Sequence, residues 1–429
     1  MNNSCILDKV AIVGAAGKMG SGIALLVADV MMRQRAAGER FGTLCLVDSS
    51  RDRLEQLRTY LETQLIKRAQ RRGEDESAVQ RFLEHGQCQM TASLDCELLA
   101  DCNVVFEAVP EREELKIDIL QRLGIVSKTM QFFSNTSSIP ISHLNQVAEL
   151  GGRIVGFHFY NPPAVQPLIE LISGSTTRPE LFHCARDLAR QMGKTVVCSK
   201  DVAGFIGNGH FIREGLFAAR CLNHFRGEFG EPEALYAVNT ITERALLRPM
   251  GIFQVVDYAG IDIFVAILDV MDRFIDHESF SESLFVNMIK KGRLGGQYSN
   301  GDQKEGFFRY EGRQPVAVYD AEIDSYRALP GGSLSNIDAA LGPLGETSWK
   351  SIRENDLGDE SVSGHFKNLL QSTGTGARLA LDFAKESRRI GKHLVAEGIA
   401  CSEEDVNSVV VNGFHHLYGP MDDGTVGNL

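Results

Sequence analysis

The stretch KVAIVGAAGKMGSGIA, residues 9–24, decides the fold of the first half of the chain. Residues 9–13 form a run rich in β-branched side chains, which predicts a buried strand, and three glycines then lead into helical spacing. Such glycines allow a sharp turn and close approach to a pyrophosphate, which the amides and dipole of the helix N-terminus attract. We therefore predict a dinucleotide site. Its expected residues are Gly14, Gly17, Lys18, Met19 and Gly20.

A second apolar run, residues 41–47, ends in Asp48. A carboxylate at this position can accept both hydroxyls of an adenosine ribose and would repel a 2′-phosphate. Asp48 therefore favours NAD over NADP as the cofactor. A structural acidic residue in a loop is the alternative, because the first glycine spacing is two residues rather than one and residues 31–42 lengthen the connection.

Apolar runs at residues 104–109 and 130–133 continue the alternation of strands and helices. This alternation is typical of the α/β class, here a doubly wound Rossmann-type sheet covered on both faces. We expect an NAD-binding domain over residues 1–200. A long polar helical stretch interrupts the rhythm and predicts an inserted helical hairpin near residues 51–86.

After about residue 200, long helical segments follow one another without a strand pattern. We expect an all-helical domain over residues 201–328, with 298–330 as a loop or linker. Glu233–Val238 can be laid on Glu404–Val409, which brings Pro249-Met250 onto Pro420-Met421. This match predicts that residues 329–429 form a second, truncated copy of the helical domain. Two unrelated helix pairs that end at prolines are the alternative.

Composition limits the possible partners. The 56 acidic and 44 basic side chains give a formal charge of −12, which disfavours nucleic acid. The nine cysteines are scattered without zinc-site spacing, so we expect reduced, buried thiols and no metal. Three aspartates in the apolar window 252–271 argue against a membrane span. The first strand leaves no room for an export signal, so we expect a cytoplasmic protein.

From Val104 onward the chain resembles the 3-hydroxyacyl-CoA dehydrogenase family in several strings that occur in the family's order and approximate spacing. The strings are VVFEAVPEREELK (104–116), SNTSSIPI (134–141), GFHFYNPPAVQPLIELI (156–172), KDVAGFIGN (200–208), RPMGIFQVVDYAGID (248–262) and GFFRYEG (306–312). With the glycine stretch, the resemblance spans about residues 9–312. It implies that the chain oxidises an L-3-hydroxyacyl-CoA to the 3-ketoacyl-CoA with NAD, in fatty-acid β-oxidation or a related degradation route.

The resemblance assigns four catalytic residues. His158 matches the catalytic base, and Glu170 matches the carboxylate that orients it. An imidazole is largely neutral at physiological pH, so it can take a hydroxyl proton as hydride leaves the same carbon. Ser137 and Asn208 match the residues that hydrogen-bond the substrate oxygens. Taken alone, His158 could be structural, and Ser137 and Asn208 could be helix-terminal polar groups.

The resemblance also implies contacts to the cofactor and to coenzyme A. Glu111, Lys116 and Asn161 match positions at the nicotinamide end or its ribose, although Lys116 could be a solvated helix charge. A basic cluster on the inserted helical segment matches contacts to the coenzyme A nucleotide, whose phosphates attract cations. Its members, which could equally form a solvated helix face, are Lys67, Arg68, Arg71 and Arg72.

The sequence departs from the family pattern at the lengthened glycine turn, at the insertion before Asp48, and at Gly209-His210, where a basic and an aliphatic residue are more usual. Two other functions remain open: an NAD-dependent dehydrogenase of a free hydroxyacid or sugar acid on the same fold, and a non-catalytic NAD-binding structural homologue. Family members with two helical copies cover their pairing surface within one chain. We therefore expect an intramolecular pseudo-dimer, with a homodimer also possible.

Overall fold

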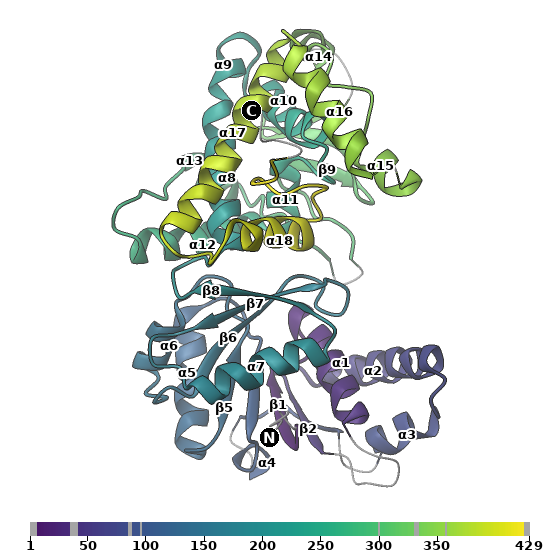
Figure 1. Ribbon diagram of the computed structural model, residues 1–429, viewed down its shortest axis with the longest axis vertical. Helices are drawn as coiled ribbons and strands as arrows, with labels where there is room; N and C mark the ends of the chain where they lie inside the picture. The colour runs from purple at the N-terminus through teal and green to yellow at the C-terminus, as the bar shows by residue number, and fades with distance from the viewer. Residues whose placement is uncertain are drawn as a thin grey trace. The chain divides into compact units, whose positions relative to one another are not determined.

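The computed structural model describes residues 7–34, 42–84, 88–94, 97–298, 301–329, 334–356 and 358–423. Most of the predicted insertion before Asp48 lies outside these residues, as do Cys5 and Cys96. The chain divides into two compact units, Met1–Phe205 and Ile206–Leu429, each shown in Figure 1.

The first unit is built on an eight-stranded sheet in the order β3-β2-β1-β4-β5-β6-β7-β8. Its strands are β1 (Lys9–Val13), β2 (Thr43–Val47), β3 (Cys88–Thr91), β4 (Val104–Glu107), β5 (Gln131–Ser134), β6 (Ile154–Phe159), β7 (Leu168–Ser173) and β8 (Thr195–Lys200). Its helices are α1 (Lys18–Arg33), α2 (Arg51–Arg72), α3 (Ser77–Glu84), α4 (Glu97–Ala100), α5 (Glu113–Val126), α6 (Ile141–Val147) and α7 (Pro179–Gln191).

The sheet is mixed rather than wholly parallel. Strands β1 to β6 run parallel, whereas β7 pairs antiparallel with β6 and parallel with β8. Only residues 160–167 connect β6 to β7. This connection is too short for the crossover that a parallel pair requires, so the chain must turn back as a hairpin.

Both faces of this sheet are covered. Alternate residues of β6, including Val155 and Phe157, join one apolar core with α1, α2 and α7. Gly156, one residue out of phase, faces the other way and lies against Ile141 of α6. His158 therefore projects from the α6 face of the sheet, because side chains alternate along a strand.

The second unit is mostly helical. It contains α8 (Gly207–Cys221), α9 (Asn223–Phe229), α10 (Glu231–Thr240), a π-helical turn η1 (Ile241–Ala245), α11 (Ile252–Ala259), α12 (Ile261–Phe274), α13 (Ser283–Lys290), α14 (Leu334–Leu341), α15 (Trp349–Asn355), α16 (Gly358–Gln371), α17 (Thr375–Ala396) and α18 (Glu403–Phe414). Helix α17 packs along α8, and α18 contacts both. Tyr418 donates a hydrogen bond of 2.9 Å to the carbonyl of Leu246.

The prediction of an all-helical second domain with a loop at 298–330 is wrong. A three-stranded antiparallel sheet stands there, formed by β9 (Phe308–Glu311), β10 (Gln314–Asp320) and β11 (Ser325–Ala328). Buried Asp257 on α11 accepts hydrogen bonds from the amides of Phe307 and Phe308. These contacts anchor the sheet from a distant helix, which the local turn-rich sequence does not indicate.

The cysteines depart in part from the prediction. Among the described cysteines, six are thiols outside disulfides, and of these Cys401 is exposed: Cys45, Cys88, Cys102, Cys198, Cys221 and Cys401. Cys184 is disulfide-bonded, which contradicts the expected reduced state and shows that sequence spacing alone does not reveal pairing. In the described part of the chain, no helix combines the length and the apolar character needed to cross a membrane.

Candidate active site

Strands β6 and β7 bring His158 and Glu170 together. The two residues face each other directly in the antiparallel register, although twelve positions separate them in the sequence. The Nδ1 atom of His158 lies 3.1 Å from Oε1 of Glu170, and the residues are 6% and 0% exposed. A carboxylate so placed holds the ring, stabilises its cationic form and leaves Nε2 to exchange a proton.

Tyr160 is a contact of this pair that the sequence reasoning missed. Its hydroxyl donates a hydrogen bond of 2.7 Å to the same oxygen, Oε1 of Glu170. Its ring is tilted by 42° against the imidazole of His158, with centroids 5.0 Å apart. Its sequence position was the available signal: Tyr160 lies two residues after His158, and side chains two residues apart lie on one face of an extended chain.

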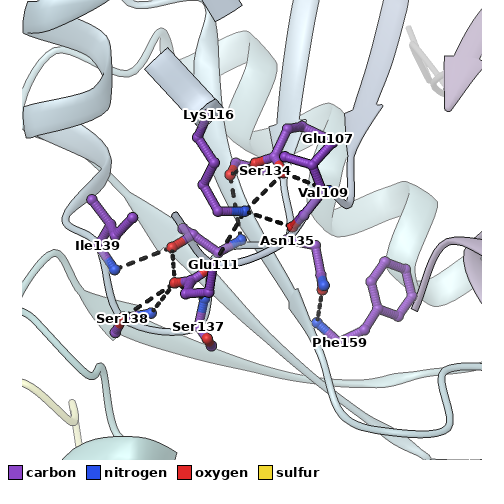
Figure 2. Close-up of polar contacts among 11 residues, drawn as sticks. Glu107, Val109, Glu111, Lys116, Ser134, Asn135, Ser137, Ser138, Ile139 and Phe159 are labelled. Carbon is purple, nitrogen blue, oxygen red and sulfur yellow. Dashed lines mark hydrogen bonds and ion pairs between the residues drawn. The ribbon is translucent and has the colours of Figure 1, made fainter. Parts of the chain in front are cut away.

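Ser137 lies in a loop that follows β5 and is held by Glu111, as Figure 2 shows. Oε1 of Glu111 accepts hydrogen bonds from the Ser137 amide at 2.8 Å and the Ser138 amide at 3.1 Å. Burial opposes ionisation of Glu111, but the charge of Lys116 and the bonds from Thr136 and Ser137 outweigh it and lower its pKa. The charged carboxylate therefore fixes the backbone that carries Ser137.

Lys116 is buried between two carboxylates. Its Nζ lies 2.7 Å from Oε1 of Glu107 and 3.2 Å from Oε2 of Glu111, and the residue is 0% exposed. Burial opposes its charge, yet Glu107 and Glu111 outweigh that effect and raise its pKa. The alternative of a solvated helix charge is therefore wrong. Whether Lys116 and Glu111 contact nicotinamide stays a prediction.

Glu107 was also missed from the sequence. Its second oxygen accepts a hydrogen bond of 2.6 Å from the Ser134 hydroxyl (Figure 2). Oδ1 of Asn135 accepts from the amide of Phe159, next to His158. The loop after β5 is thus tied to the end of β6. A glutamate that ends an apolar strand was the signal, because such a group must find a buried partner.

The glycine turn has the shape of a phosphate cradle. Gly14 has a φ of +81°, and a Cβ there would lie 2.6 Å from the carbonyl oxygen of Ala108. A Cβ on Gly20 would lie 2.0 Å from the carbonyl oxygen of Gly14. Gly17 caps α1 without a side-chain acceptor, so no cap side chain covers Lys18 and Met19 at the helix start. These residues fit a dinucleotide pyrophosphate.

Asp48 lies against this turn. Its Oδ2 accepts from the Ala16 amide at 3.1 Å, and its Oδ1 from the Ser50 amide at 3.1 Å. Arg53, which the sequence reasoning missed, makes an ion pair of 3.1 Å with Oδ1. The carboxylate is therefore oriented beside the glycines, and its contact with an adenosine ribose stays a prediction.

The predicted coenzyme A cluster divides into two pairs. Lys67 and Arg71 are exposed on α2. Arg68 and Arg72 bind buried Asp29 on α1, at 3.4 and 2.9 Å. Asp29 therefore gives these two arginines a role in joining α2 to α1.

Two further predicted residues complete the set. Asn161 is the second residue of the connection between β6 and β7, next to Tyr160. Asn208 is the second residue of α8, in the second unit, so its part in the site stays a prediction.

A possible metal-binding group exists among the described residues, although none was predicted. Its members, in the second unit, are His277, Glu278 and His393. Both carboxylate oxygens of Glu278 accept from Arg213, at 2.9 and 2.7 Å. A bidentate arginine competes directly with a cation for these oxygens, so we assign no metal here.

Comparison with known proteins places these features in one family. The description "3-hydroxyacyl-CoA dehydrogenase, NAD binding domain" matches residues 9–202, and the corresponding C-terminal domain matches 219–309. A probable 3-hydroxybutyryl-CoA dehydrogenase of Deinococcus radiodurans is 30% identical over 304 residues, covering 70% of this chain and 100% of that protein. The mitochondrial hydroxyacyl-coenzyme A dehydrogenase of Rattus norvegicus is 30% identical over 312 residues, covering 71% and 92%.

Solved structures agree. FadB2 of M. tuberculosis is 29% identical with a TM-score of 0.57, covering 71% of this chain and 100% of that one. The 3-hydroxybutyryl-CoA dehydrogenase of Escherichia coli, at 22% identity and a TM-score of 0.66, covers 97% and 90% and supports the fold alone. On these matches, the chain belongs to the 3-hydroxyacyl-CoA dehydrogenase family of NAD-dependent oxidoreductases.

Proposed function

We propose that the protein oxidises the 3-hydroxyl of an L-3-hydroxyacyl-CoA to a ketone. The observation that carries this proposal is the buried His158–Glu170 pair, with Nδ1 and Oε1 3.1 Å apart. When bound, NAD accepts the hydride that leaves C3 of the substrate. His158 takes the hydroxyl proton on Nε2, and Glu170 stabilises the imidazolium that forms. The route is fatty-acid β-oxidation or a related degradation, and a cytoplasmic location is part of the proposal.

The remaining polar residues bind and orient. Ser137 and Asn208 would donate hydrogen bonds to the substrate oxygens, where charge develops during transfer. Asp48 would hold the adenosine ribose beside the glycine turn, which the hydrogen bond from Ala16 supports. Lys67 and Arg71 are the better candidates for coenzyme A phosphates, because Arg68 and Arg72 already bind Asp29.

We further propose that residues 1–200 bind NAD. Residues 329–429 are, in this proposal, a truncated second copy of the mostly helical domain formed by 201–328. The packing of α17 along α8 supports an internal pseudo-dimer. The hydrogen bond from Tyr418, next to the repeat match at Pro420, to Leu246 supports it as well. Self-association into a homodimer remains compatible with this arrangement.

The direct test mixes protein, NADH and acetoacetyl-CoA and follows the loss of NADH absorbance. We expect rapid oxidation of NADH with acetoacetyl-CoA and little with free acetoacetate. The free acid lacks the nucleotide whose phosphates Lys67 and Arg71 on α2 would bind. Faster turnover of a free hydroxyacid or sugar acid would favour the second candidate. NADH binding without turnover of any hydroxyacyl compound would favour a structural homologue and overturn the proposal.

A further inference from the structure

The hydroxyl of Tyr160 shares an acceptor with the catalytic base. Oε1 of Glu170 lies 2.7 Å from the Tyr160 hydroxyl and 3.1 Å from Nδ1 of His158. Oε1 of Glu170 therefore accepts from two donors, His158 and Tyr160, which lie at the end of β6. When a second donor binds a carboxylate oxygen, it offsets part of the negative charge on that oxygen and restricts the rotation of the carboxylate.

The Tyr160 hydroxyl stays protonated. Burial, and after it the charge and hydrogen bond of Glu170, raise the pKa of this hydroxyl well above its usual value. Tyr160 is therefore a constant donor across the pH range in which the enzyme works, and it adds no titration of its own.

We propose that Tyr160 is a positioning residue that sets the basicity of His158 through Glu170. The hydroxyl fixes the Glu170 carboxylate with Oε1 toward the imidazole and weakens the pull of that oxygen on the imidazolium. The inference deepens the proposed function and depends on it for its catalytic meaning.

Among the described residues, apolar side chains pack around the pair. At the Glu170 position β8 presents Val197, and α6 turns Ile141 and Leu144 toward the sheet. The ring of Phe205 packs 6.0 Å from that of His158. Two further carboxylates lie on adjoining segments, and each has partners of its own: Glu111 binds Lys116 and the Ser137 loop, and Asp201 accepts from the amides of Ile141 and Ser142.

The variant Tyr160→Phe removes only the hydroxyl. Without it, Oε1 of Glu170 no longer shares its negative charge with this hydroxyl, so the carboxylate attracts the imidazolium more strongly. We expect the acid limb of the kcat/KM profile for hydroxyacyl-CoA oxidation to move up by about half to one pH unit. The Kd for NADH should stay unchanged.

A second readout does not require turnover. Histidine NMR titration, with the His158 signal assigned by its loss in His158→Gln, should show the titration midpoint moving up in Tyr160→Phe. Tyr418→Phe is the matched control, because it removes a tyrosine hydrogen bond to the Leu246 carbonyl in the other unit.

The outcomes separate the inference from the proposed function. An unchanged or lowered acid limb and midpoint in Tyr160→Phe would overturn the inference, even if overall activity fell. A wild-type protein that turns over no hydroxyacyl-CoA would defeat the proposed function, while the NMR titration would still decide the role of Tyr160.

Discussion

At the residue scale, the proposed chemistry depends on the hydrogen bond between Nδ1 of His158 and Oε1 of Glu170. Glu170→Gln replaces the carboxylate with an amide, which cannot stabilise the imidazolium and can select the wrong tautomer. We expect kcat to fall by about 10²- to 10⁴-fold with little change in NADH affinity. Steady-state kinetics and NADH fluorescence measure both. Glu180→Gln, at an exposed position on α7, should behave as wild type. Equal losses in both variants would contradict the assignment.

A second residue-scale prediction concerns Lys116. Its removal in Lys116→Met leaves Glu107 and Glu111 buried without their counter-charge. We expect a loss of about 3–5 kcal/mol in the free energy of unfolding, measured by urea denaturation and circular dichroism. Lys128→Met removes an exposed lysine of the same unit and serves as the control. If the two variants were equally stable, the ion pairs of Lys116 with Glu107 and Glu111 would not stabilise the loop that carries Ser137.

At the element scale, the glycine turn and α1 must stay in close contact. Gly20→Ala would place a Cβ 2.0 Å from the Gly14 carbonyl oxygen, so the turn must open. We expect the Kd for NADH, measured by calorimetry, to rise by about tenfold or more. Gly227→Ala is the control, because a Cβ at that helical glycine meets nothing within 4 Å. Wild-type affinity in Gly20→Ala would show that this turn does not hold the pyrophosphate.

Elements with a strong local pattern could be predicted from the sequence, whereas long-range pairings could not. The run ending at Gly14 predicted β1, and the apolar runs at residues 104–109 and 130–133 predicted β4 and β5. The reversal of β7 followed from the length of a loop, and the sheet at 308–328 depends on Asp257, about fifty residues earlier in the chain. The hydrogen bonds of the Tyr160 hydroxyl and the Glu107 carboxylate depend on contacts between segments that lie apart in the sequence, which local patterns do not define.

At the scale of the whole molecule, the buried side chain of His210 joins a C-terminal helix to the first helix of the second unit. Nε2 of His210 on α8 lies 3.2 Å from the carbonyl oxygen of Ser387 on α17. Burial lowers the pKa of His210 and, still more, that of His416. The departure at Gly209-His210 thus places a helix-joining residue where the family usually has an aliphatic one.

These lowered pKa values predict acid sensitivity. In the unfolded chain these histidines bind protons below about pH 6.5, whereas in the folded unit they stay neutral to lower pH. The stability is therefore fully present above about pH 6.5 and is lost as the pH falls. We expect the second unit to lose about 1–2 kcal/mol between pH 7.5 and 5.5, and His210→Gln to reduce this loss. The single tryptophan, Trp349, donates to the His415 carbonyl and reports urea unfolding of this unit. A pH-independent midpoint would contradict the prediction.

The most direct test of the central claim is the turnover of His158→Gln compared with its binding of NADH. If His158 accepts the substrate's proton, oxidation of NADH by acetoacetyl-CoA falls by at least about 10³-fold. The Kd for NADH stays near the wild-type value, because the imidazole acts on the substrate and not on the cofactor's phosphates. Near-normal turnover with weakened NADH binding would contradict the account.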